Sequence, residues 1–200
     1  MIYALRLKNA RMVRMESPIE RMRFFKNALR DHKVGAITMS SGYVVADVLR
    51  RLPENPRLIV EYGPGEGAIT RAILRMLPPD ARLMAVEPNK EFFATLQKIA
   101  DHRLTVLSKT AQDLSPKELL LMKGADAVVA SLPSFYLSKE ERRKVVADAY
   151  AMLAHGGVFI FSHQYSWLMR RPILERFPKV SLSFEPRNLF PCFILTAQKS

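Results

Sequence analysis

The stretch Ile59–Gly67, Ile-Val-Glu-Tyr-Gly-Pro-Gly-Glu-Gly, decides the fold class of this 200-residue chain. Its apolar start predicts a buried strand, and Gly63, Gly65 and Gly67 follow at alternate positions directly before a helical pattern. Glycine allows a tight turn and lets the backbone approach a ligand closely. By themselves, the glycines fit a dinucleotide pyrophosphate as well as another cofactor.

Short β-rich runs alternate with helical patterns on both sides of this turn, which is typical of βαβ units. The expected strands lie at 57–61, 82–87, 103–107, 125–130, 157–164, 179–185 and 190–197. The expected helices lie at 67–77, 90–100, 116–122, 138–153 and 168–176. The sequence therefore predicts an α/β fold: a seven-stranded, mostly parallel Rossmann-like sheet with helices on both faces and a closing hairpin.

The chain is long enough for one sizeable core and too short for two. We expect a single domain, with a core at 53–200 and a basic, amphipathic helical arm at 1–52 packed on it. The arm's first helix has one apolar stripe between basic edges. A second helix is expected from about residue 41 to Leu52, ended by Pro53.

Positive charge dominates the composition: 31 Lys and Arg residues against 19 Asp and Glu give a formal net charge of +12. Such a surface attracts polyanions, and nucleic acid and the anionic membrane leaflet both qualify. No window approaches the roughly 18 apolar residues that span a bilayer, and no clean signal-peptide core is present, so we expect a cytoplasmic protein. The lone cysteine, Cys192, reads as a buried thiol in a strand.

Two carboxylates flank the glycine turn. Glu61 lies two residues before Gly63, at the end of the first expected strand. Glu87 ends the second expected strand, where a carboxylate can accept hydrogen bonds from both ribose hydroxyls. The alternative is that Glu87 only caps the next helix, although Asn89 can also do so.

With Pro64 between its first two glycines, the turn resembles the first motif of class I S-adenosylmethionine-dependent methyltransferases more than a dinucleotide fingerprint. The resemblance implies S-adenosylmethionine as the cofactor. The residues expected to bind it are Glu61, Gly63, Gly65, Gly67, Glu87, Pro88, Thr110, Ala111 and Ser131. The chain departs from the family pattern where Thr110 replaces an aspartate before Ala111. The adenine amine would then be held by Thr110, Gln112 or a backbone group, and Asp113 would cap the helix that follows.

The loop after the fourth expected strand, Ser131–Tyr136, should face the transferred methyl group, because open α/β sheets bind ligands at this edge. Nucleobase amino methyltransferases often carry Asn or Asp, two prolines and an aromatic residue here, whereas this chain has Ser131 and Ser134 in place of the amide and the second proline. A serine hydroxyl or a main-chain carbonyl can still accept a hydrogen bond from an amine. The alternative is a plain turn with Phe135 in the core.

From about Phe24 to Leu195 the chain resembles the bacterial phospholipid N-methyltransferases, which are themselves similar to the ribosomal RNA adenine dimethyltransferases. The resemblance is carried by Val34–Ser41, the glycine turn, Val86–Asn89, Ser131–Pro133, Ser162–Tyr165 and Arg187–Pro191. It implies methyl transfer to the amine of phosphatidylethanolamine. Such an in-line displacement needs a neutral, aligned amine, so positioning and desolvation outweigh acid–base catalysis.

The resemblance also implies where the substrates bind. The candidate catalytic residues lining the amine are Ser131, Tyr136 and Tyr165, while Tyr43 and the Ser40–Ser41 pair close over the cofactor and His163 stays structural. On the arm, Phe24 and Phe25 would dip into an anionic membrane, with Arg21 and Lys26 on lipid phosphates. The expected partners are this membrane surface, at the inner face of the cytoplasmic membrane, and its phospholipid; we expect a monomer without metal.

The strongest rival is an RNA methyltransferase whose basic arm contacts phosphates. The Ser-Leu-Pro-Ser sequence at 131–134 counts against it, as does a chain that stops after the seventh expected strand without a further helical domain. A small-molecule amine methyltransferase, or a cofactor-binding module without catalysis, is the third alternative.

Overall fold

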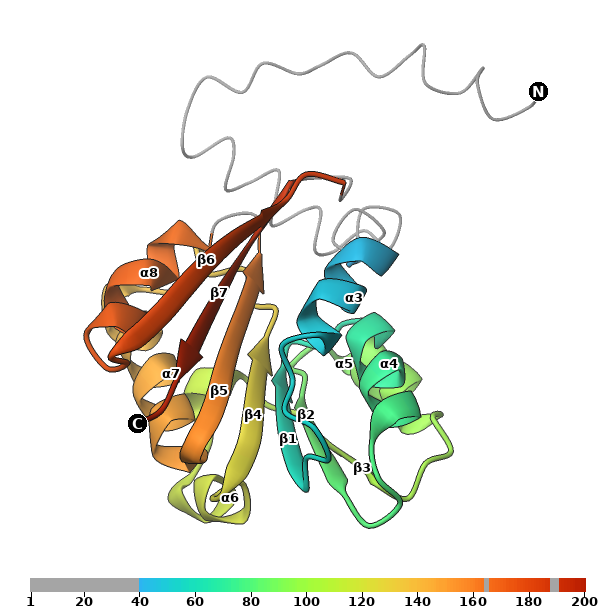
Figure 1. Cartoon of the computed structure of the whole chain (residues 1–200). Coiled ribbons are helices and arrows are strands. Elements are labelled where there is room, and N and C mark those ends of the chain that lie inside the picture. The colour runs from blue at the N-terminus through green and yellow to red at the C-terminus, as the bar shows by residue number, and fades with distance from the viewer. Residues whose placement is uncertain (1–39, 164–165, 188–190) are drawn as a thin grey trace, which may run out of the picture. The chain divides into compact units, whose positions relative to one another are not determined.

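The computed structural model describes residues 40–163, 166–187 and 191–200, which belong to one compact unit that begins at residue 39 (Figure 1). Its sheet has seven strands in the order β3-β2-β1-β4-β5-β7-β6. The strands are β1 Leu58–Tyr62, β2 Arg82–Val86, β3 Leu104–Leu107, β4 Ala125–Ala130, β5 Leu153–His163, β6 Lys179–Glu185 and β7 Cys192–Gln198. The helices are α3 Gly42–Leu49, α4 Ala68–Met76, α5 Lys90–Gln97, α6 Pro116–Leu121, α7 Lys139–Met152 and α8 Trp167–Leu174. The predicted α/β class and mostly parallel sheet are confirmed.

Strands β1 to β5 run parallel, and β7 lies antiparallel to both β5 and β6, as expected for a closing hairpin. The one clear difference from the sequence prediction is the start of β5. Leu153 already pairs with Ala125, before a register shift that places Val158 opposite Ala127. Gly156, at φ +78°, lies inside this irregular stretch. The stretch does not follow the regular strand pattern, so the sequence analysis placed the start of the strand too late.

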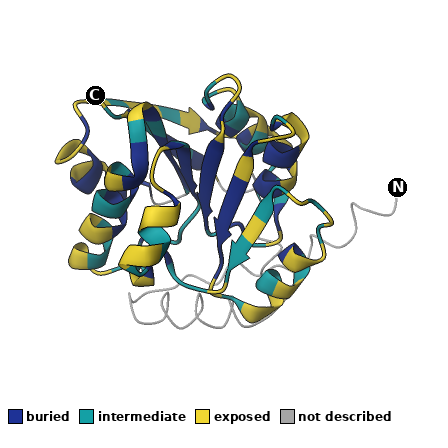
Figure 2. Ribbon diagram, turned by 90° about the horizontal axis from the view of Figure 1, so that it is seen from below, coloured by how far each residue is buried: buried dark blue, intermediate teal, exposed yellow. Residues whose placement is uncertain are grey.

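Helices cover both faces of the sheet, and the central strands are buried between them (Figure 2). One core cluster joins the sheet to α7 and α8 through residues such as Val145, Phe159 and Ile173. The other joins the opposite face to α3 and α4 through Val48 and Ile73. All five residues of β1 are buried, as expected for a parallel strand covered on both faces.

The helix α3 belongs to this core unit, because Val44 and Val48 are fully buried in the cluster beneath α4. The core therefore includes residues that the sequence analysis assigned to the arm at 1–52. The apolar face of α3 completes one layer over the sheet. The expected amphipathic helix with Arg21, Phe24, Phe25 and Lys26 lies outside the described residues.

Candidate active site

The strand order reverses direction between β1 and β4, since β2 and β3 continue on one side and β5 on the other. Open α/β sheets bind their ligands at such a switch point, beyond the carboxyl ends of the strands. Tyr62 pairs with Ala130 at these ends, and the Ser131 N–H donates to the Tyr62 carbonyl at 2.9 Å. The glycine turn and the loop after β4 therefore meet.

The three glycines of the turn all have positive φ, at +70° for Gly63, +56° for Gly65 and +84° for Gly67. A Cβ at Gly63 would lie 2.9 Å from the Leu132 side chain and 3.0 Å from the Ser131 carbonyl oxygen, so only glycine lets the two loops touch. A Cβ at Gly65 would meet nothing within 4 Å, so this part of the turn faces open space. Gly63 and Gly67 are thus packed against neighbouring side chains, whereas Gly65 borders open space.

Glu61 is buried at the end of β1, with an exposed fraction of 1%. Its Oε2 accepts a hydrogen bond from the Thr70 hydroxyl at 2.7 Å, whereas Oε1 has no partner among the described residues. Burial raises the pKa of Glu61 to about 7, despite the opposing hydrogen bond from Thr70. Thr70 was missed by sequence reasoning; its signal is a polar residue on the otherwise apolar face of α4.

Glu87 is also buried and connects two loops. Its Oε2 accepts from the Gly65 N–H at 3.0 Å and its Oε1 from the Asn89 N–H at 2.9 Å. Burial raises its pKa. Asn89 itself caps α5 by accepting from the Glu91 and Phe92 N–H groups, so the alternative that Glu87 is a simple cap is wrong.

The loop after β3 contributes a buried Ala111 and a half-buried Thr110, whose hydroxyl donates to the Asp113 carboxylate at 2.5 Å. Asp113 does not cap the following helix, because Ser115 and Glu118 form a reciprocal capping box there. Pro88 is exposed beside Glu87. The assignments of Thr110, Ala111 and Pro88 to the cofactor remain predictions.

At the ends of β4 and β5, the Ser131 and Ser162 hydroxyls lie 3.0 Å apart, so two polar groups mark the base of the site. The Tyr136 hydroxyl is buried without a partner among the described residues, and burial raises its pKa. Phe135 packs on the Tyr136 ring at a centroid distance of 4.1 Å and is half-buried rather than in the core. The loop does form a turn, with the Tyr136 N–H bonded to the Pro133 carbonyl, but Phe135 is not in the core. That the loop faces the transferred methyl group stays a prediction.

Three other residues named in the sequence analysis remain. Tyr165 lies outside the described residues. Tyr43 is half exposed, and the Arg187 guanidinium stacks over its ring at 4.2 Å, so in this structure it faces the β6–β7 hairpin. His163 has its backbone N–H bonded to Ser166, and burial lowers its pKa to about 4, as expected for a structural residue.

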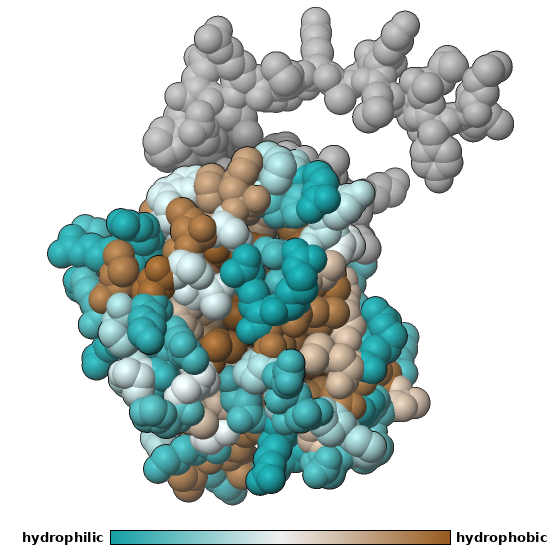
Figure 3. Space-filling view, viewed as in Figure 1, coloured by the Kyte–Doolittle hydropathy of each residue, from teal (hydrophilic) through white to brown (hydrophobic). Residues whose placement is uncertain are grey.

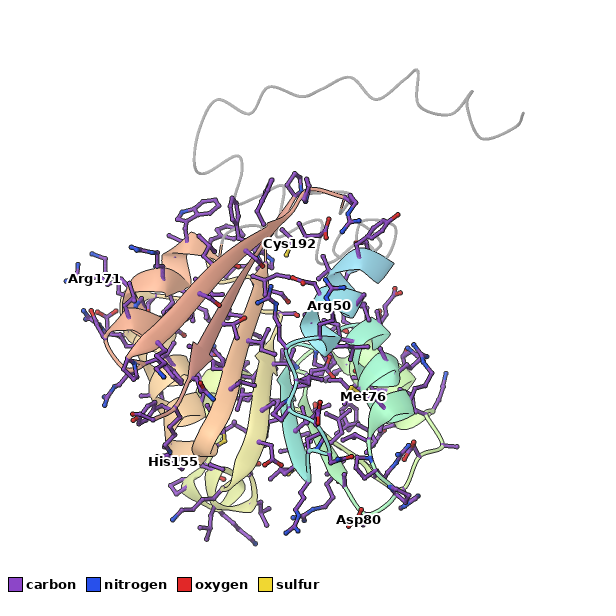
Figure 4. The ribbon with its side chains drawn as sticks, in the orientation of Figure 1. Arg50, Met76, Asp80, His155, Arg171 and Cys192 are labelled. Atoms are coloured by element: carbon purple, nitrogen blue, oxygen red, sulfur yellow. The ribbon has the colours of Figure 1, made fainter. Side chains whose placement is uncertain are left out.

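Cys192 is a buried free thiol in β7, as predicted, and burial raises its pKa to about 12. It lies near the carboxyl edge of the parallel strands, whereas Asp80 and His155 lie at the opposite edge (Figure 4). Among the described residues, no group of three or more His, Cys, Asp or Glu side chains could hold a metal ion, and no helix is long and apolar enough to cross a membrane.

These features fit S-adenosylmethionine. A buried carboxylate oxygen without a partner suits the cofactor's ammonium group, and the open side of Gly65 suits close approach of a ligand to the backbone. Glu87, beside the same turn, suits the ribose hydroxyls. The fold and site together define a nucleotide-cofactor enzyme of the methyltransferase class.

Comparison with known proteins agrees. Residues 59–157 match the family model described as "Methyltransferase domain". An ornithine lipid N-methyltransferase from Singulisphaera acidiphila is 31% identical over 84% of this chain and 88% of its own length. The chain belongs to the class I S-adenosylmethionine-dependent methyltransferases. Within that class, it is related to a lipid N-methyltransferase.

Other similar proteins match a shorter part of the chain or have a lower sequence identity. A ribosomal RNA small subunit methyltransferase A from Nitrobacter winogradskyi is 34% identical, but over only 40% of this chain and 28% of its own length. Among solved structures, a precorrin-6y methyltransferase from Geobacter metallireducens matches with a TM-score of 0.65 and 15% identity, covering 82% of this chain and 90% of its own. The N-methyltransferase NodS from Bradyrhizobium japonicum, in complex with S-adenosyl-L-homocysteine, matches with a TM-score of 0.58 and 16% identity, covering 92% and 89%. These two structures support the fold alone.

Proposed function

We propose that this protein transfers a methyl group from S-adenosylmethionine to the amine of a membrane lipid headgroup. The observation that carries the proposal is the 31% identity to an ornithine lipid N-methyltransferase over 84% of this chain and 88% of that protein's length. Phosphatidylethanolamine is the acceptor we favour, since it also presents an amine on a lipid. The inner face of the cytoplasmic membrane is the proposed location.

The site's residues suit such a reaction without a strong base. When bound, the cofactor supplies an electrophilic methyl group on a sulfonium sulfur. Glu61 and Glu87 would hold and orient it. The acceptor nitrogen would form the new N–C bond as the bond between the methyl group and sulfur breaks and leaves the neutral thioether, and the methylated nitrogen would then lose its proton to solvent. The Ser131 hydroxyl or carbonyl and the Tyr136 hydroxyl would position the neutral amine, so that alignment and exclusion of water lower the barrier.

An RNA substrate is the second candidate, because the chain is strongly basic and similar to a ribosomal RNA methyltransferase. That similarity covers 40% of the chain, however, against 84% for the lipid enzyme. The shorter match supports a shared cofactor-binding core more than a shared acceptor.

The test is transfer of labelled methyl to vesicles that contain phosphatidylethanolamine or ornithine lipid, with unmodified ribosomal RNA in parallel. Vesicles of phosphatidylcholine alone, whose nitrogen is already quaternary, give the background. Label in either amine lipid supports the proposal, and the ratio of the two identifies the preferred headgroup. Label in RNA alone, or in no acceptor while the cofactor still binds, would overturn it.

A further inference from the structure

Several large apolar side chains are about half exposed on the β6–β7 hairpin and the start of α8. Trp167 is 53% exposed, Leu182 is 54% exposed and Phe184 is 52% exposed. Together with Phe193 they form what we call the aromatic patch. Three side chains of this size at one place are more than the scattered apolar residues normal for a surface, and contiguous apolar patches often mark binding sites.

The four residues form one surface. Phe193 lies at its centre: the Phe184 ring is 4.9 Å away between centroids, and the Trp167 ring packs edge-on at 6.3 Å. Leu182 and Phe184 alternate along β6, so their side chains share one face of the hairpin. Hydrophobic atoms are visible among hydrophilic ones over the region of β6 and α8 (Figure 3).

The aromatic patch adjoins the acceptor end of the site. Phe193 pairs with His163 of β5, the residue directly after Ser162, whose hydroxyl contacts Ser131. The buried Ser166 hydroxyl lies 2.7 Å from the His163 carbonyl and 2.8 Å from the Phe193 carbonyl and donates to one of them. Trp167 follows Ser166 directly, so this hydrogen bond fixes the position of the patch relative to the ends of β5 and β7, beside the proposed acceptor site.

Arginines lie on the same elements as the patch or directly after them. The helix α8 carries Arg170 and Arg171 and has no acidic residue within Trp167–Leu174. Arg171 points away from the sheet (Figure 4), and 85% of its side-chain surface is exposed even though it contacts Glu175. Arg187 follows β6 and pairs with Glu185. Tryptophan and phenylalanine with neighbouring arginines are typical of surfaces that contact the headgroup region of a bilayer.

We propose that the aromatic patch is a bilayer-contact surface on the methyltransferase core, with Trp167 and Phe184 entering the headgroup region and the arginines near lipid phosphates. This inference rests on the proposed function, because a lipid acceptor has to reach the Ser131–Ser162 edge from the membrane. Contact at the adjoining patch would hold that edge against the headgroups. It would add to any contact made by residues 1–39.

Trp167 is the only tryptophan of the chain, so its fluorescence reports on the patch directly. The full-length protein is mixed with vesicles of phosphatidylcholine and phosphatidylglycerol, which contain no acceptor amine. We expect a blue shift of the emission and quenching by lipids brominated on their acyl chains. Vesicle binding without either change would overturn the proposal, because Trp167 would then stay away from the bilayer. No vesicle binding at all would overturn it as well.

A pair of variants gives a second readout. Phe184→Ser should lower vesicle partitioning, measured by sedimentation, about tenfold. Leu120→Ser is the matched control, because Leu120 is 68% exposed on α6, before the amino end of β4, and should leave partitioning unchanged. Circular dichroism confirms that both variants fold. Equal loss in both variants, or in neither, would contradict the proposal.

The vesicle measurements do not depend on methyl transfer, so they separate this inference from the proposed function. Phe184→Ser should keep its transfer rate on an amine lipid dispersed in detergent and lose it on the same lipid in vesicles. Loss in both settings would place Phe184 in the reaction site instead of the membrane contact and would overturn the inference. Membrane contact without transfer to any lipid amine would overturn only the proposed function.

Discussion

The Glu61 Oε2 accepts a hydrogen bond from the Thr70 hydroxyl at 2.7 Å, while the Oε1 of the same buried carboxylate has no partner among the described residues. Thr70 lies on α4, nine positions after Glu61, so the helix that follows the glycine turn orients the carboxylate that precedes it. A buried polar atom without a partner is costly, and one placed at a ligand site is usually satisfied by the ligand.

Removing either of the two buried carboxylates beside the glycine turn, Glu61 or Glu87, should weaken cofactor binding. We expect Glu61→Ala and Glu87→Ala each to lower the affinity for S-adenosylhomocysteine by about 10- to 100-fold, the range of one charged hydrogen bond. Isothermal titration calorimetry measures it. Glu66→Ala, an exposed carboxylate of the same turn, is the control and should bind normally. Unchanged affinity in the two buried variants would contradict the assignment.

The stability of the unliganded protein should depend on pH through Glu61. Burial raises its pKa from 4.5 to about 7, so the folded chain keeps a proton that the unfolded chain has lost between these values. The resulting stabilisation is fully present below about pH 4.5 and is lost as the pH rises through about 7. Between about pH 5 and about pH 8, the free energy of unfolding should fall by roughly 1–3 kcal/mol more than in Glu61→Gln. Urea unfolding checks this, and parallel pH profiles would refute it.

The two glycines of the turn should respond differently to alanine. Both substitutions place a side chain at positive φ, which costs about 1–2 kcal/mol. Gly63→Ala also drives a methyl group into Leu132 and the Ser131 carbonyl, so its loss of stability should be the larger. Gly65→Ala meets no protein atom and should instead mainly lower cofactor affinity, since its methyl group enters the open region. Thermal unfolding and calorimetry separate the two; equal effects on both measures would be inconsistent with this geometry.

Tyr136→Phe should separate activity from stability. Its hydroxyl is buried without a partner, so removing it should leave the free energy of unfolding unchanged or raise it by up to about 1 kcal/mol. If the hydroxyl positions the acceptor amine, methyl transfer should fall about tenfold while cofactor affinity is kept. Single-turnover transfer assays beside urea unfolding provide the measurement. A destabilised variant with normal transfer would show a purely structural role.

Local patterns in the chain were sufficient to predict the fold class, because the secondary-structure elements and the glycine turn are both properties of neighbouring residues. The strands and helices follow from the alternation of β-rich and helical periods, and the turn follows from glycines, which adopt φ values of +56° to +84° at little cost. The placement of Glu61 and Glu87 beside this turn could be predicted because each stands at a set distance from it in the sequence, whereas their roles toward the cofactor stay predictions. These signals all lie within a few tens of residues.

Tertiary structure alone decided the contacts between segments far apart in the chain. Ser131 meets Ser162 because β4 and β5 end at one edge, and Arg187 meets Tyr43 because the hairpin returns beside α3. No local period encodes either pairing. Burial, too, is a sum over distant neighbours: the pKa of Glu61 near 7 and the half-exposed ring of Trp167 depend on which layers cover them. The site's chemistry and its proposed membrane contact therefore follow from the packing of the sheet, since that packing sets which polar atoms lose water and which apolar ones keep it.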